Sequence, residues 1–100
     1  MDYIRELRNA IRNLHGCAAS YVETVPVIET FRGQIVWQGD VEVFNIRNHP
    51  KARRCYAWAH TSGENDRRKR YVVVLEIPPV ESAQTAVRAA IVDEFKSREA

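Results

Sequence analysis

One short segment contains aromatic and imidazole rings at every second position, a pattern suited to ligand binding. In Cys55–His60 the side chains of Tyr56, Trp58 and His60 fall on one face of an extended strand, opposite the small residues. Aromatic rings supply large contact areas, and an uncovered row of them forms a binding groove or a dimer interface. We predict a ligand site formed by Tyr56, Trp58, His60 and Trp37. The alternative is that a helix covers this row and makes it core.

Charge provides a second candidate site. Residues 51–70 contain seven basic side chains and two acidic ones, a local charge of +5 in a chain whose formal net charge is +2. If strands continue on both sides of the polar turn at 63–66, Arg67, Arg68, Lys69 and Arg70 form a charged two-stranded arm that can lie along phosphates. The alternative is a solvated hairpin tip whose charges discourage aggregation. The candidate residues for anion or nucleic-acid binding are Arg53, Arg54, Arg67, Arg68, Lys69 and Arg70.

The His and Cys residues lack the spacing that a metal site or a catalytic nucleophile needs. The His and Cys side chains are scattered along the chain, without the close pairs that zinc sites use. Cys55 and His60 lie five residues apart on one strand, so they point to opposite faces and cannot form a catalytic dyad. We assign no metal ligand, no cofactor and no catalytic residue. A non-catalytic binding domain is favoured over an enzyme.

The apolar composition predicts a sheet as the element that positions these residues. The chain has 12 Val and 7 Ile but only 3 Leu, and β-branched side chains fit a pleated sheet better than a helix. At 100 residues, with 45% hydrophobic and 28% charged residues, the chain is one globular domain spanning 1–100.

Hydrophobic periodicity predicts the order α-β-β-β-β-α. A stripe of Ile4, Leu7, Ile11 and Leu14 indicates a helix over 2–15, and Ser82 is the expected start of a second helix that ends near residue 97. Strands are predicted at 21–31, 35–46, 55–60 and 67–77. Short connections make the sheet antiparallel. The predicted fold is therefore α+β, a four-stranded antiparallel sheet with the two terminal helices packed on one face.

Three local features refine this sheet. Pro26 cannot donate to a strand ladder, which places its strand at an edge or at a bulge. Gly39 beside Asp40 indicates a bulge or a close backbone approach. The run Tyr71–Leu75 is apolar on both faces, as is typical of a central strand covered on both sides.

Cysteine usage and hydropathy predict the cellular setting. Cys17 and Cys55 are too few and too far apart for a disulfide framework, so we expect two free, buried thiols in a reduced protein. The start of the chain lacks the apolar core of a secretory signal, and no apolar run exceeds five residues. We expect a cytoplasmic protein without a membrane segment. The expected partner is a small molecule or a protein, with a homodimer formed through an edge strand or the aromatic row.

Several segments together resemble small uncharacterised bacterial proteins carried on mobile gene cassettes. The segments are Gly39–Phe44, His49–Ala52, Tyr56–Trp58 and Pro78–Val80. This resemblance implies neither an activity nor a site.

Overall fold

The computed structural model describes residues 2–61 and 69–99, except the side chains of 61, 69 and 95–99. The elements follow the order α-β-β-β-β-α, as the sequence predicts. They are α1 (Tyr3–His15), β1 (Ala18–Phe31), β2 (Gln34–Arg47), β3 (Arg54–Thr61), β4 (Lys69–Leu75) and α2 (Ala83–Glu99). In the part of the chain described, no helix is both long and apolar enough to cross a membrane.

Capping fixes the ends of α1. The Asp2 carboxylate accepts the N–H groups of Ile4 and Arg5, and Gly16 closes the helix in the left-handed conformation with a φ of 69°. Glycine adopts that conformation without steric cost, which is why it is favoured after a helix. Between the caps, Leu7 and Ile11 are fully buried.

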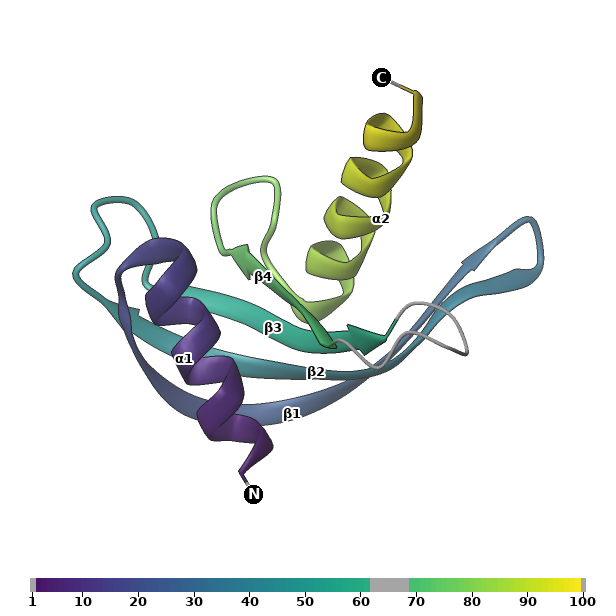
Figure 1. Cartoon of the computed structure of the whole chain (residues 1–100). Coiled ribbons are helices and arrows are strands. Elements are labelled where there is room, and N and C mark those ends of the chain that lie inside the picture. Colours follow the sequence, from purple (N-terminus) through teal and green to yellow (C-terminus); the bar gives the residue numbers. More distant parts are fainter. Residues whose placement is uncertain (1, 62–68, 100) are drawn as a thin grey trace.

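The four strands form an antiparallel meander in the order β1-β2-β3-β4, but the three ladders differ in length (Figure 1). The β1–β2 ladder runs from Ala18↔Arg47 to Phe31↔Gln34, and the β3–β4 ladder from Cys55↔Leu75 to Thr61↔Lys69. Between β2 and β3 only four pairs form, from Glu42↔Ala57 to Asn45↔Arg54. The sheet therefore consists of two long hairpins joined by a short central ladder.

The two helices lie on opposite faces of the sheet, so the prediction that both pack on one face is wrong. On one side, Leu7 and Ile11 of α1 pack with Phe44, Cys55 and Ala57. On the other side, α2 covers a separate cluster that includes Val41, Val43, Tyr56, Trp58, Ala86 and Val87. Strands alternate their side chains between the faces, and here both sets are apolar, so each face needs its own helix.

Strand β4 is an edge strand, although its apolar residues on both faces suggested a central one. Its odd-numbered apolar residues, Tyr71 and Val73 among them, pack on the α1 side, while Val72 and Val74 pack on the α2 side. A helix on each face of the sheet thus explains why β4 is apolar on both faces, although it has a neighbouring strand on one side only.

Strand β1 forms the other edge, as Pro26 predicted. Its register shifts between Tyr21 and Glu23 and again between Glu29 and Thr30, whereas Gly39 pairs regularly with Val27. No bulge therefore occurs at Gly39. The other interpretation of Gly39, a close approach to its backbone, is confirmed by the position of Trp37 described below.

Both cysteines are free and buried in the cluster beneath α1. Burial raises the pKa of the Cys55 thiol to about 12, with a smaller contribution from the nearby Cys17. Neither thiol is exposed enough to serve a surface site.

Helix α2 is tied to β1 by a polar contact at the rim of its buried face. The Glu29 carboxylate accepts hydrogen bonds from Gln84 at 2.7 Å and from the Arg88 guanidinium at 2.8 Å. These two bonds, the one from Gln84 foremost, lower the pKa of Glu29 below its ordinary value of 4.5.

Phe44 and Phe31 provide a matched pair for testing the core. Phe44 is fully buried, whereas Phe31 is 62% exposed near the tip of the β1–β2 hairpin. We expect Phe44→Ala to lower the free energy of unfolding by about 3–5 kcal/mol, because it leaves a cavity. Phe31→Ala should change it by no more than about 0.5 kcal/mol. Denaturant titration followed by circular dichroism measures both, and equal losses would contradict this account of the core.

The Glu29 contact predicts an acid-sensitive contribution to stability. Because the pKa of Glu29 is lower in the folded chain, its contribution is present above the ordinary carboxyl pKa and is lost as pH falls through the folded value. The melting temperature of the native protein should exceed that of Glu29→Gln at neutral pH, and the difference should shrink in acid. A difference that stayed constant over the acid range would be inconsistent with this contact.

Candidate ligand-binding cleft

A cavity of about 410 Å³ lies where β2 and β3 part beyond the central ladder. Its volume lies within the range of small-molecule sites, roughly 300–1,000 Å³. Strand β2 contributes five residues between positions 37 and 42, β3 contributes three residues, and α1 contributes one residue. The lining residues are Tyr3, Trp37, Gln38, Gly39, Asp40, Glu42, Trp58, Ala59 and His60.

Two tryptophans connect the hairpins on the α2 side of this cleft. The rings of Trp37 and Trp58 meet edge to face, with centroids 5.4 Å apart and planes at 66°. The indole of Trp37 lies over its own strand, so a Cβ on Gly39 would come within 3.2 Å of its Cη2 atom. Gly39 therefore leaves the space in which this indole lies against Trp58.

A buried carboxylate lies at the inner end of the cleft. Glu42 is only 5% exposed, and its Oε1 atom accepts the hydroxyl proton of Thr24 on β1. Since that proton is used, the Tyr21 hydroxyl donates to Thr24 Oγ1 at 2.6 Å, and the three side chains form one hydrogen-bonded chain. Within residues 2–61 and 69–99, Glu42 forms no ion pair. Its negative charge is thus held by neutral donors alone.

Tyr3 completes the cleft from the α1 side. Its hydroxyl accepts the backbone N–H of Ala59 at 2.9 Å. Ala59 lies beyond the last β2–β3 pair, so this hydrogen bond satisfies a donor that faces the gap between the hairpins.

Three of the four residues predicted for the ligand site line this cleft: Trp37, Trp58 and His60. Tyr56 does not, because it is buried under α2 with its hydroxyl donating to the Glu76 carboxylate. Burial and, to a lesser extent, that carboxylate raise the pKa of Tyr56 well above its usual range. The aromatic row is therefore largely core, and only its far end opens to this cleft.

A second cavity, of about 330 Å³, lies near the start of α2 beside Glu23, Arg54 and Tyr56. Several of its polar groups have partners within the chain. Tyr56 bonds to Glu76, and the first turn of α2 is capped by Ser82, whose hydroxyl accepts the N–H of Thr85 at 3.2 Å. These internal bonds make it a weaker candidate than the cleft.

The basic residues predicted for anion binding that the structure describes lie in two groups. Arg53 and Arg54 lie at one end of β3, whereas Lys69 and Arg70 begin β4 and pair with the opposite end of β3. The six residue-to-residue steps from Arg54 to His60 separate the two groups by about 20 Å, at roughly 3.3 Å per step. Arg67 and Arg68 lie outside the described residues, and only the backbone of Lys69 is described.

Sequence reasoning missed Glu42, Asp40 and Tyr3 as parts of the cleft. The signal for Glu42 was its even-numbered position in β2. It therefore points to the α1 face, together with the buried residues Phe44 and Ile46. A charged side chain among inward-facing apolar ones indicates a special environment. No comparable signal marks Tyr3, which reaches the cleft only through the packing of α1.

Gly39 allows a direct test of the tryptophan arrangement. Gly39→Ala would place a methyl group against Trp37, so we expect the Trp37–Trp58 contact to shift and stability to fall by about 1 kcal/mol. Near-ultraviolet circular dichroism reports the two indoles, and Trp37→Phe gives the spectrum without their contact. Gln38→Ala, an exposed neighbour, is the control and should leave the spectrum unchanged. An unchanged spectrum for Gly39→Ala would refute the close approach.

Among the described residues, no three His, Cys, Asp or Glu side chains gather as metal ligands would. Comparison with known proteins adds no relative from which a function could be transferred. No protein-family model matches the chain, and neither a curated protein nor a solved structure shows significant similarity to it.

Proposed function

We propose that this protein is a non-catalytic binding domain that takes a small, positively charged ligand in the cleft between its two hairpins. One observation supports this proposal above the others. Among the described residues Glu42 forms no ion pair, although it is buried and lines a cavity together with two tryptophans.

Electrostatics favours a cationic ligand. Removing a carboxylate from water costs several kcal/mol unless a charge or several donors compensate it. The described partner of Glu42 is a single neutral hydroxyl, and Asp40 adds a second carboxylate on the same face of β2, closer to solvent. A cation entering the cleft would meet both carboxylates.

The aromatic walls favour the same class of ligand. The face of an indole ring attracts a cation, and the interaction contributes about 0.5–2 kcal/mol depending on how far the cation is desolvated. Trp58 is 4% exposed and fixed by the core, so its position does not depend on a ligand. The Trp37 ring is partly buried and in contact with it.

The arrangement of titratable groups supports binding over catalysis. Even-numbered residues of β3 share a face with Tyr56 and Trp58 beneath α2, so His60 lies on that side. Asp40 and Glu42 share the opposite face with Phe44. An acid and a base that act together must reach a common atom. Among the described residues, no hydrogen bond or ion pair joins His60 to Asp40 or Glu42, so no acid–base pair is formed in the cleft.

Three probes that share one ring and differ in charge test this function. Cyclohexylammonium, cyclohexanol and cyclohexanecarboxylate do not absorb where tryptophan does, so a change in Trp37 and Trp58 fluorescence reports binding. We expect cyclohexylammonium to bind about tenfold more tightly than cyclohexanol, a difference of about 1.4 kcal/mol. Cyclohexanecarboxylate should bind most weakly.

Glu42→Gln should abolish the preference for the cation, because the amide keeps an acceptor for Thr24 but loses the charge. Glu81→Gln carries the same charge change on an exposed residue outside the cleft and should retain the preference. Equal affinity for cyclohexanol and cyclohexylammonium would refute the proposal that the ligand is positively charged. A fluorescence response to none of the probes would refute the cleft as a binding site.

A further inference from the structure

The connection between β2 and β3 is a strongly basic surface that the cleft does not use. From Val43 to Gly63 the sequence contains four Lys or Arg residues and no Asp or Glu. Three of the four, Arg47, Lys51 and Arg53, are exposed, and we name these three the basic turn. None of them forms an ion pair within the part of the chain that the structure describes.

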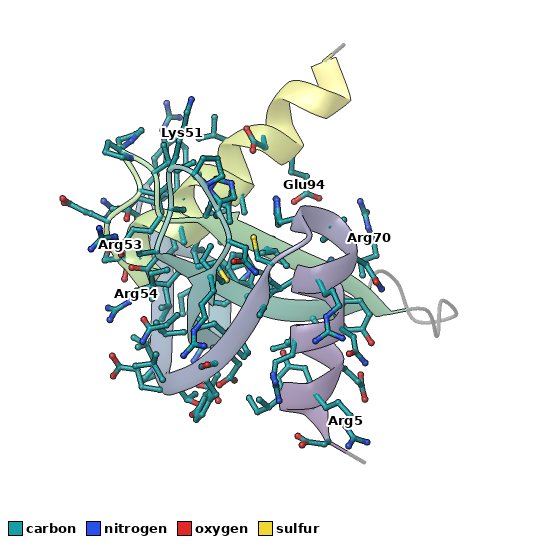
Figure 2. The ribbon with its side chains drawn as sticks, turned by 90° about the vertical axis from the view of Figure 1, so that its left-hand side faces the viewer. Arg5, Lys51, Arg53, Arg54, Arg70 and Glu94 are labelled. Atoms are coloured by element: carbon teal, nitrogen blue, oxygen red, sulfur yellow. The ribbon has the colours of Figure 1, made fainter. Side chains whose placement is uncertain are left out.

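The strand ladders bring the basic turn to one end of the sheet. Arg47 pairs with Ala18 at the end of the β1–β2 ladder, and the Ile46 N–H donates to the Arg53 carbonyl at 2.9 Å. Figure 2 looks toward this end, and Lys51 and Arg53 lie on the opposite side of the view from Arg5 and Arg70. The cations of the turn therefore share one surface, which lies away from Arg5 and Arg70.

The backbone of the turn is fixed from within. Asn48 adopts a left-handed φ of 68°, and the Nδ1 atom of His49 accepts the N–H groups of Lys51 and Ala52, each at 3.0 Å. Ala52 is 2% exposed and anchors the turn in the cluster beneath α1. A turn held in this way presents its cations with little loss of backbone freedom on binding.

Arg54 differs from the three residues of the basic turn. It is half-buried beside the Tyr56 hydroxyl, which donates to the Glu76 carboxylate, and it lines a cavity together with Glu23. Arg54 is therefore less open to an external anion than the other three, and it belongs to the packing of the sheet. The free charge of this surface is that of Arg47, Lys51 and Arg53.

We infer that the basic turn binds the phosphate backbone of duplex nucleic acid, independently of its base sequence. Fixed cations without ion pairs suit an array of phosphates, which releases counterions when the protein binds. The residues from Arg47 to Arg54 include no Phe, Tyr or Trp on which an unpaired base could stack. Backbone contact with a duplex therefore fits this surface better than single-strand recognition.

The test is the salt dependence of binding to a short fluorescein-labelled DNA duplex, measured by fluorescence anisotropy. Three phosphate contacts predict a slope of about −2.7 in a plot of log affinity against log salt concentration. The variant Arg47→Ala/Lys51→Ala/Arg53→Ala should lose the binding seen at low salt. Arg5→Ala/Arg32→Ala/Arg70→Ala changes the net charge equally on other surfaces and should keep a slope close to that of the native protein.

Three outcomes would overturn this inference. They are no binding by the native protein at low salt, an equal loss in both triple variants, and preferential binding to vesicles of phosphatidylcholine and phosphatidylserine over DNA. The second outcome would mean that net charge alone attracts the duplex, and the third that the surface faces a membrane. Glu42→Gln should leave duplex binding intact, so this test and that of the cleft succeed or fail separately.

Discussion

The short ladder between β2 and β3 is the contact on which the rest of the structure depends. Four residue pairs join two hairpins whose internal ladders extend well past them. So short a ladder would be a weak joint by itself, because a strand pair is stable only when its faces are covered. The helices supply this cover, since α1 contacts β1, β3 and β4 while α2 contacts β1, β2 and β4. Each helix therefore spans both hairpins from its own side of the sheet.

The end of this ladder also creates the cleft. Up to Glu42↔Ala57 the backbone groups of β2 and β3 satisfy one another, and beyond that pair the strands diverge. Residues from both faces of the sheet then meet across the gap, which a continuous sheet would prevent. This explains how Trp37 and Trp58 from the α2 side come to line the same cavity as Glu42 and Tyr3 from the α1 side. Glu42 is buried because it belongs to the last pair.

Local periodicity was sufficient to predict the element order, the antiparallel sheet and the division of β2 and β3 into two faces. It could not predict the placement of the helices, because β4 presents Val72 and Val73 to opposite sides with equal apolar character. The same limit applies to the site. Alternation identified Trp37, Trp58 and His60, while Tyr3 entered through contacts across more than fifty residues of sequence. The sequence also did not show how far Arg54 lies from Arg70, because that separation depends on the pairing of β3 with β4.

The burial of the two cysteines has a consequence for how the folding of this chain can be followed. A thiol reacts with alkylating reagents as its thiolate, and burial raises the pKa of Cys55 to about 12, so very little of this thiol is ionised at neutral pH. Cys55 lies beneath α1 in the layer that includes Phe44 and Leu7. Its modification thus requires that layer to open. The rate of alkylation by a small reagent therefore measures how often α1 separates from the sheet, in the native sequence and without an added label.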